Sequence, residues 1–307
     1  MKPTLVTGAS GFVGPHLVAA LARHGWKLRL LVRRWSPLPS LAGVEAELVL
    51  GDLADEAALR RLVRGADAVI HAAGLIKARD ERDFIAVNRD GTALLSALAS
   101  EQPVILLSSL AAREPHLSAY AASKRSAEQV VAGRSGPWLV VRAPAVYGPG
   151  DRETLPYFRM ARRGWVPRPH LPEARLSLIH VADLADVLAK AAGSPVGRSL
   201  YEIDDGQEGG HTYGEMARAA GAALGRRVLQ VPVPKHFLSG VAGLVAVRQV
   251  LGGRPVILTH GKVAEMFHPD WAVHDRRLER TLGFHPRYDL GAGFADTVSW
   301  YRAHNWL

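Results

Sequence analysis

A tyrosine, a lysine and a serine near the middle of the chain have the spacing of an acid–base site. Tyr120 and Lys124 are four residues apart in a segment with a helical pattern, Ala119–Ala132, so their side chains share one helix face. The pKa of a tyrosine phenol is normally about 10, and a neighbouring ammonium lowers it by stabilising the phenolate. Ser109, at the end of a predicted strand, would hold a substrate oxygen beside Tyr120. The three residues predict proton transfer to or from that oxygen.

A glycine-rich segment near the start of the chain predicts a phosphate-binding turn. Gly8, Gly11 and Gly14 follow the first predicted strand and open the first predicted helix. The first two glycines let the backbone approach a pyrophosphate at the helix N-terminus, and the third lets helix and strand pack closely. The cofactor contacts expected here are Gly8, Ser10, Gly11, Phe12, Val13 and Gly14. This strand–glycine–helix order predicts a dinucleotide site.

The ends of the following strands supply further candidate contacts for the dinucleotide. Arg33 and Arg34 stand where an NAD-specific protein more often has an acid, and a guanidinium there binds a 2′-phosphate, so NADP(H) is preferred over NAD(H). The alternative for both is a solvated surface position. Asp52, followed by Leu53, can accept from the adenine amino group or cap the next helix. The small residues Ala72, Ala73 and Gly74 let the chain pass under a nucleotide.

The elements that must position these residues alternate in type through the first half of the chain. Predicted strands are Thr4–Thr7, Lys27–Val32, Ala46–Leu50, Ala68–His71, Val104–Ser108 and Trp138–Arg142. Predicted helices are Phe12–His24, Ala54–Arg64, Arg82–Ser100 and Ala119–Ala132. Because the strands are almost continuously apolar, they predict a parallel sheet covered by helices on both faces.

The fold class is therefore α/β, a doubly wound parallel sheet (Rossmann fold) with a smaller C-terminal α/β substrate lobe. We expect residues 1–150 to form the dinucleotide-binding domain. Residues 151–307 should form mostly the substrate lobe, with short strands near Leu176–Ile179 and Ser199–Ile203, and with residues 175–192 returning to the Rossmann core.

Composition narrows the class of protein. The chain has 307 residues, no cysteine and a formal net charge of +9, with 48% hydrophobic and 22% charged residues. These values exclude a disordered chain, a disulfide scaffold and a thiolate metal site. The histidines lack metal-ligand spacing, so no metal is expected.

The positive charge is spread along the chain, which favours anionic ligands or an anionic membrane surface. No nucleic-acid-binding motif accompanies this charge. A short apolar run at the N-terminus predicts no signal peptide and a cytoplasmic protein, with peripheral contact at the inner membrane face left open.

One segment of the second half lacks charge. No Asp, Glu, Lys or Arg occurs from His236 to Val247, and Lys235 and Arg248 flank it. Twelve residues are too few to span a bilayer. The segment is either a buried helix of the second lobe, or a hydrophobic lid or interfacial helix beside an apolar substrate, with its basic flanks at anionic headgroups.

Further segments extend the pattern over nearly the whole chain: Val87–Thr92 around Asn88, Arg142–Gly150, Arg175–Asp183, and the tail with Asp275, Leu282–Phe284, Pro286 and Trp300–Tyr301. With the glycine segment, Asp52, Ser109, Tyr120 and Lys124, these motifs resemble the extended short-chain dehydrogenases/reductases of the NAD(P)-dependent epimerase/dehydratase type. The resemblance implies an NAD(P)-dependent oxidoreductase acting on an alcohol or a ketone.

The resemblance also implies roles for individual residues. Tyr120 would exchange a proton with the substrate oxygen, Lys124 would bind the nicotinamide ribose, and Asn88 would order a water-linked proton path to Lys124, with helix packing as its alternative role. Pro144 and Val146 would lie beside the nicotinamide. Substrate contacts are expected at Leu110, Tyr147, Arg175 and His180. A homodimer would form through the helical segments 82–100 and 117–132.

Several sequence features discriminate between reactions within this family. Sugar dehydratases of this family resemble one another in having an acidic pair after the serine or threonine. Here the residues after Ser109 are Leu110 and Ala111, which argues against a sugar dehydratase. The Arg33–Arg34 pair departs from the acid that is common in epimerases. The charge-free segment and the run Val228–Pro234 favour an apolar pocket, so we expect reduction of a keto group on a hydrophobic substrate such as a long-chain 3-keto lipid. The alternatives are a nucleotide-sugar epimerase or reductase using Arg175 or Arg254 for the diphosphate, and an NADPH-binding structural or regulatory subunit without turnover.

Overall fold

The computed structural model describes residues 4–33, 44–78, 80–194, 197–250 and 259–307. Residue contacts divide the chain into two compact units. Unit 1 comprises residues 1–143, 184–202 and 277–284, and unit 2 comprises residues 144–183, 203–276 and 285–307. The two short returns to unit 1 bring helix and strand segments from the second half of the chain to the dinucleotide-binding fold.

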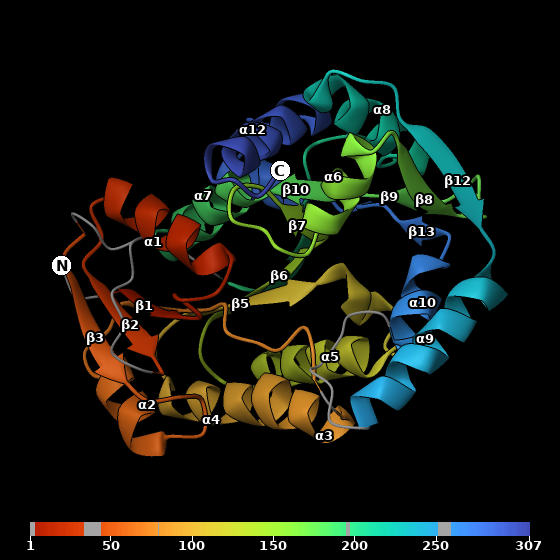
Figure 1. Ribbon diagram of the computed structural model, residues 1–307. Coiled ribbons are helices and arrows are strands. Elements are labelled where there is room, and N and C mark those ends of the chain that lie inside the picture. Colours follow the sequence, from red (N-terminus) through yellow and green to blue (C-terminus); the bar gives the residue numbers. More distant parts are fainter. Residues whose placement is uncertain (1–3, 34–43, 79, 195–196, 251–258) are drawn as a thin grey trace. The chain divides into compact units, whose positions relative to one another are not determined.

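Unit 1 contains a parallel sheet, as the sequence predicted, and the sheet has seven strands, one more than the six predicted in the first half of the chain (Figure 1). Its strand order is β11-β6-β5-β4-β1-β2-β3. The strands are β1 Thr4–Thr7, β2 Leu28–Val32, β3 Ala46–Leu50, β4 Ala68–His71, β5 Val104–Ser109, β6 Trp138–Ala143 and β11 Arg198–Glu202. The chain runs outward from β1 to β3 and then crosses back to β4, so the order reverses between β1 and β4. Ligands of such sheets bind at the carboxyl ends of the strands beside that reversal.

Helices cover both faces of this sheet (Figure 1). On one face lie α1 and α7, which an Arg23–Asp186 ion pair of 2.7 Å connects. On the other face α2, α4 and α5 bury leucine, alanine and valine side chains against the strands. The helical segments are α1 Val13–Arg23, α2 Glu56–Val63, α3 Glu81–Phe84, α4 Gly91–Leu98, a 3₁₀ turn Leu110–Arg113, α5 Ala119–Ala132, α7 Val181–Ala192 and α11 Arg277–Leu282.

The segment predicted as one helix, Arg82–Ser100, is interrupted by a π-helical stretch. Ile85–Asp90 has π-helical bonding and separates α3 from α4. At the start of α4, a Cβ on Gly91 would lie 2.7 Å from the Cβ of Leu53, so glycine permits the close approach of α4 to the loop after β3. π-Helical turns are frequent at functional sites, and this one places the side chain of Asn88 in the interior.

A buried ion pair fixes α5 against the sheet. Arg142 on β6 donates from Nε and Nη2 to the two carboxylate oxygens of Glu128 on α5, at 2.8 and 2.7 Å. The hydroxyl of Ser108 on β5 donates to Glu128 at 2.6 Å. The Arg142 guanidinium also lies 3.7 Å from a carboxylate oxygen of Glu202 on β11. Because buried charges are costly unless they are paired, these contacts favour one position of α5 over β5 and β6.

Unit 2 has an aromatic core. Phe158 packs edge to face on Phe294 and Tyr301, with ring centroids 4.9 and 5.7 Å apart, and Tyr147 packs edge to face on Phe294 at 5.1 Å. Three short parallel ladders belong to this unit: β7 Ala145–Tyr147 with β10 Leu178–His180, β8 Trp165–Pro169 with β12 Leu229–Val233, and β9 Arg175–Leu176 with β13 Asp270–Trp271. The helices are α6 Leu155–Arg162, α8 Tyr213–Leu224, α9 Lys235–Val250, α10 His260–Met266 and α12 Leu290–Ala303.

The structure differs from two predictions for the second half of the chain. The strand predicted at Ser199–Ile203 and placed in the second lobe is β11, which pairs with β6 and ends the large sheet. The charge-free segment forms α9, but Phe237 and Leu244 on that helix are exposed, so the buried-helix alternative is wrong for these two side chains. No helix in the described ranges is both long enough and apolar enough to cross a membrane.

We expect Arg142→Ala to lower the free energy of unfolding by about 3 kcal/mol, because it leaves the buried carboxylates of Glu128 and Glu202 without their shared cation. Urea unfolding followed by circular dichroism measures this loss. The matched control is Arg60→Ala, which removes an exposed ion pair with Glu56 and should cost less than about 0.5 kcal/mol. Equal losses in the two variants would contradict the role assigned to Arg142.

Candidate active site

The glycine turn brings the loops after β1 and β4 together at the point where the strand order reverses. Gly8 has a φ of +80°, and a Cβ there would lie 2.7 Å from the carbonyl carbon of Ala72. A Cβ on Gly14 would lie 2.3 Å from the carbonyl oxygen of Gly8. Both positions therefore require glycine. The result is a tight turn that leaves Ser10 and Gly11 exposed.

The start of α1 is suited to a bound anion. Its N-cap residue, Phe12, makes no side-chain hydrogen bond to the backbone N–H groups of the first turn. In contrast, Asp55 and Ser118 accept such bonds at the starts of α2 and α5. Unpaired N–H groups at a helix N-terminus attract a pyrophosphate. With the glycine turn beside it, this helix end fits the phosphates of a nicotinamide dinucleotide, and Val13 and Gly14 form its first residues.

The candidate adenosine contacts follow paired positions of β2 and β3. Val32 pairs with Leu50, and the backbone N–H of Gly51 donates to the carbonyl of Val32 at 3.0 Å. Arg33 directly follows β2, and Asp52 follows β3 after Gly51; both side chains are exposed. The Asp52 carboxylate accepts from the N–H of Ala54 at 2.8 Å, while Asp55 caps α2, so helix capping does not require Asp52. Leu53 is buried, and Arg34 lies outside the described residues.

A buried histidine connects the glycine turn to the π-helical segment. The Thr92 hydroxyl donates to the carbonyl of Asn88 at 2.6 Å, so it accepts from His71 Nε2 at 2.9 Å. His71 Nδ1 then accepts from the Thr7 hydroxyl at 2.7 Å, and that hydroxyl accepts from the N–H of Ala73 at 3.2 Å. Burial, aided by the positive charge of Lys124, lowers the pKa of His71 to about 3. The ring is thus neutral, with its proton on Nε2.

Asn88 connects the loop after β4 to α5. Its side-chain oxygen accepts from the N–H of Leu75 at 2.7 Å, and its amide donates to the carbonyl of Leu75 at 3.0 Å and to the Ser123 hydroxyl at 2.9 Å. Ser123 in turn donates to the carbonyl of Tyr120 at 2.7 Å. A Cβ on Gly74 would lie 3.0 Å from Asn88 Oδ1 and 3.9 Å from Lys124 Nζ. Asn88 therefore has a positioning role in α5, and the proton path stays a prediction.

Lys124 is buried with an altered pKa. Its Nζ donates to the carbonyl of Leu107 on β5 at 2.6 Å, and the residue is 8% exposed. Burial lowers its pKa to about 8, and the nearby negative charge of Glu128 opposes that shift. A lysine with this pKa is mostly charged at neutral pH but releases its proton more readily than an exposed lysine. It is therefore suited to tuning a neighbouring phenol.

Tyr120 and Ser109 complete the candidate set in unit 1. Tyr120 lies in the first turn of α5, one helical turn before Lys124, and its half-buried ring is 6.1 Å from that of Phe84. Ser109 ends β5, and its hydroxyl accepts from the N–H of Ala111 at 3.2 Å. Leu110, expected to contact substrate, is 2% exposed, and that contact stays a prediction.

The remaining candidates lie in unit 2. Tyr147 and His180 are paired on β7 and β10 and are almost fully buried. The Tyr147 ring belongs to the aromatic core, and the His180 ring stacks on Tyr288 at 3.9 Å with Nε2 3.2 Å from an Asp296 oxygen. Both have evident packing roles. Pro144 is buried, Val146 is half-buried and Arg175 is exposed on β9. Substrate or cofactor contact by these residues remains a prediction.

Sequence reasoning missed Thr7, His71, Thr92, Ser123 and Glu128. The only local sign was that polar residues occur inside apolar strand and helix patterns, as His71 does at the end of Ala68–His71. Their partners are as far as 64 residues away in the sequence, so spacing alone did not pair them.

Comparisons with known proteins agree with this geometry. Residues 4–203 match the family described as the NAD dependent epimerase/dehydratase family. A ceramide reductase of Caulobacter vibrioides is 42% identical over 304 residues, covering 98% of this chain and 95% of that protein. The 4-hydroxy-2-methyl-3-oxo-4-farnesyl-3,4-dihydroquinoline-1-oxide ketoreductase of Stigmatella aurantiaca is 30% identical over 230 residues, covering 66% of this chain and 68% of that protein.

The fold has a close counterpart among solved structures. The crystal structure of gox2253 has a TM-score of 0.81 and 25% sequence identity, and the alignment covers 100% of both chains. The family match extends over well more than half of the chain and includes the glycine turn, Asn88, Ser109, Tyr120 and Lys124. The family and the oxidoreductase class predicted from the motifs are confirmed: the chain belongs to the NAD dependent epimerase/dehydratase family.

Proposed function

We propose that this chain is an NADPH-dependent reductase of the keto group on a long-chain lipid of the ceramide class. The observation that carries the proposal is the 42% identity to a ceramide reductase along almost the full length of both chains. A second relative is named as a ketoreductase of a farnesylated substrate. Both names describe the reduction of a hydrophobic molecule. The apolar segments of this sequence favour the same class of substrate.

The chemistry assigned to this chain is proton transfer and orientation. Tyr120 gives its phenolic proton to the ketone oxygen, and the Ser109 hydroxyl holds that oxygen by a hydrogen bond. The ammonium of Lys124 stabilises the phenolate that remains. The nicotinamide dinucleotide, when held at the glycine turn, would supply the hydride for the carbonyl carbon. The phenol is then restored by a proton from solvent, so each ketone consumes one hydride and one proton and leaves as an alcohol.

The proposed preference for NADP(H) is supported by Arg33. This exposed guanidinium follows β2, at the strand edge where the adenosine ribose of a bound dinucleotide lies. The nearest acid on the neighbouring strand end, Asp52, is engaged with the backbone N–H of Ala54. A guanidinium binds a 2′-phosphate by charge-assisted hydrogen bonds.

The proposal has two further parts. A long-chain substrate resides in a bilayer, so the enzyme must meet a membrane surface peripherally to reach it. A homodimer formed through the helical segments 82–100 and 117–132 is the proposed assembly, and sedimentation equilibrium tests it.

We expect the purified protein to oxidise NADPH when a 3-keto-ceramide is supplied in detergent micelles and to produce the corresponding alcohol, identified by mass spectrometry. Tyr120→Phe should lower kcat about 100-fold or more, because the ketone oxygen then lacks its proton donor. UDP-glucose is the control substrate. Turnover of UDP-glucose with no reduction of the ketone would refute the proposal in favour of a sugar-nucleotide enzyme.

The rate of ketone reduction should fall as pH rises through about 8, because Lys124 loses its positive charge in that range and no longer stabilises the phenolate. Glu128→Gln should move this fall to lower pH, since the Glu128 charge raises the pKa of Lys124. The amide preserves the shape of the side chain between Ser108 and Arg142. Profiles of kcat against pH test both statements, with the exposed Glu56→Gln as control. Superimposable profiles for the wild type and Glu128→Gln would rule out this role of Glu128.

Replacement of both arginines after β2, Arg33→Ser with Arg34→Ser, should raise the Kd for NADPH at least about tenfold and leave the Kd for NADH nearly unchanged, because only NADPH carries the 2′-phosphate. Fluorescence titration of each cofactor measures the two constants. The control is Arg60→Ser on the exposed surface of α2. Equal weakening of both cofactors would show that these arginines are not the phosphate contact.

A further inference from the structure

Basic and acidic residues are segregated within unit 2. From Met216 to Ala264 the sequence contains no Asp or Glu and seven Lys or Arg residues. Residues 1–44, in the first half of the chain, likewise contain no Asp or Glu, so the absence of carboxylates alone does not single out this stretch, and the exposed side chains carry the argument. In the described part of this stretch lie most of α8, all of β12, α9 and the first residues of α10. The charged side chains within this stretch are therefore all basic, and one of them, Lys262, is paired with Glu265 just beyond it at 2.9 Å.

The same elements expose large apolar side chains. On α9, Phe237 is 60% and Leu244 is 74% exposed, and on β12, Leu229 is 68% exposed. Leu229 pairs with Trp165 of β8, which is also exposed, so the two side chains lie on the same face of this ladder. Among the described residues, five of the seven exposed large hydrophobics are on β8, β12 and α9, Val231 being the fifth. β12 leads directly into α9, so exposed apolar side chains recur along two consecutive elements, and such exposure is typical of interaction surfaces.

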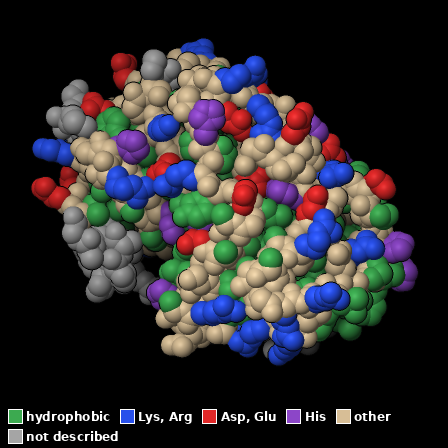
Figure 2. Space-filling model, turned by 90° about the horizontal axis from the view of Figure 1, so that it is seen from above, with side chains coloured by type: hydrophobic (Ala, Val, Ile, Leu, Met, Phe, Trp, Pro, Cys, Tyr) green, Lys and Arg blue, Asp and Glu red, His purple; other side chains and the backbone are tan. Residues whose placement is uncertain are grey.

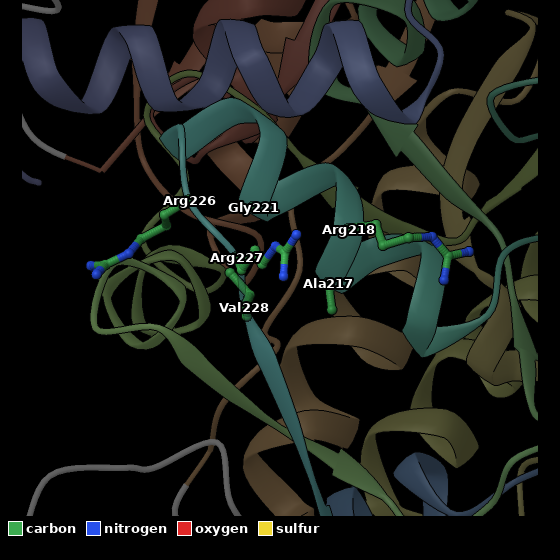
Figure 3. Close-up of a pocket in the computed structure, with 6 residues that line it drawn as sticks. All are labelled: Ala217, Arg218, Gly221, Arg226, Arg227 and Val228. Carbon is green, nitrogen blue, oxygen red and sulfur yellow. The ribbon is translucent and has the colours of Figure 1, made fainter.

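Arginines stand at the start of β12. Arg218, Arg226 and Arg227 line an open pocket of about 290 Å³ where α8 ends and the chain turns back into β12 (Figure 3). In Figure 3 the side chains of Arg226 and Arg218 extend in opposite directions, with the guanidinium of Arg227 between them. The turn is made by Gly225, with a φ of +72°, and a Cβ on Gly221 would lie 2.6 Å from the carbonyl oxygen of Arg226.

These guanidiniums have no carboxylate partner in the described part of the chain, and no acidic residue lines their pocket. Lys235, at the other end of β12, is likewise exposed without an acidic neighbour in its segment. On the right-hand side of the view in Figure 2, hydrophobic and basic side chains lie next to one another near the lower edge, where acidic side chains are sparse. The cations are thus available to an external anion.

A bilayer with anionic headgroups matches both properties of this surface. Apolar side chains on a helix and a strand gain free energy by entering the boundary between headgroups and acyl chains, and each nearby Lys or Arg adds electrostatic attraction to anionic lipid. Arg226 and Arg227 precede β12, and Lys235 begins α9, so cations adjoin the elements that carry the apolar side chains, as expected when cations stay at the headgroups while the apolar side chains go deeper.

We propose that β12 and α9, with Trp165 of β8 and with Arg226 and Arg227 between α8 and β12, form a docking surface for an anionic lipid bilayer. We call this set the docking surface. The proposal relies on the proposed lipid substrate only to explain why this protein binds a membrane: the docking surface brings unit 2 to the membrane that holds the substrate. Binding itself requires neither cofactor nor turnover, so the two ideas can fail separately.

Flotation of the full-length protein with vesicles tests the docking surface. One vesicle contains phosphatidylcholine alone, and the other contains phosphatidylcholine with phosphatidylglycerol. We expect at least about tenfold tighter binding to the anionic vesicle, weakened by added salt. Phe237→Glu with Leu244→Glu, and separately Arg226→Glu with Arg227→Glu, should each reduce binding about tenfold or more.

The matched control is Lys27→Glu with Arg64→Glu, two exposed residues of unit 1 whose replacement changes the net charge as much as the arginine pair does. It should retain wild-type binding within about twofold, because attraction to the headgroups falls off within a Debye length of the membrane surface. Circular dichroism and reduction of a short-chain, water-soluble 3-keto-amide show that each variant is folded and active. Loss of vesicle binding with that activity retained supports the docking surface.

Three results would overturn the proposal. Equal binding to both vesicles, or to neither, excludes a surface for anionic lipid. Equal weakening by the control variant assigns binding to net charge. A change in sedimentation coefficient for Phe237→Glu with Leu244→Glu, with vesicle binding unaltered, assigns the surface to a second copy of the chain. Absence of ketone reduction with normal vesicle binding would instead refute the proposed function and leave the docking surface intact.

Discussion

The carboxylate of Glu128 is the interaction on which the candidate site depends. It accepts two hydrogen bonds from Arg142 and one from Ser108, and these contacts join α5 to β5 and β6. The same negative charge lies near Lys124, whose burial would otherwise lower its pKa further. One side chain therefore determines both where the helix that carries Tyr120 sits and how strongly its lysine keeps a proton.

A second set of contacts depends on the uncharged form of His71. His71 is buried between Thr7 and Thr92, and every polar atom of its ring has a hydroxyl partner. Because burial opposes the charged form, the ring remains neutral and can connect the loop after β1 to the π-helical segment that holds Asn88. The glycine turn, the loop after β4 and α5 are thus joined by directional hydrogen bonds, which hold catalytic groups in place better than apolar packing alone.

Unit 2 follows a different principle. Its interior is aromatic and closely packed around Phe158, whereas β12 and α9 carry exposed apolar side chains in a stretch, Met216 to Ala264, whose sequence has no Asp or Glu. Exposed apolar side chains beside cations are what the proposed docking to an anionic bilayer requires. This arrangement is consistent with a substrate that must be taken from a lipid phase.

The sequence by itself determined the local elements and the chemistry they carry. Strand Ala46–Leu50 and helix Ala119–Ala132 have the predicted bounds, because apolar periodicity and capping residues act over a few positions. The glycine spacing and the Tyr120–Lys124 pair were readable for the same reason. These local signals were also sufficient to identify the family.

Only the tertiary structure decided the properties that depend on distant partners. It assigned β11 to the large sheet, interrupted the helix around Asn88 and paired His71 with residues 64 and 21 positions away. It also buried Lys124 and left Phe237 exposed, although the first is charged and the second aromatic. Burial and hydrogen-bond pairing are set by which surfaces meet when the chain folds, and residue type and spacing along the sequence do not contain that information.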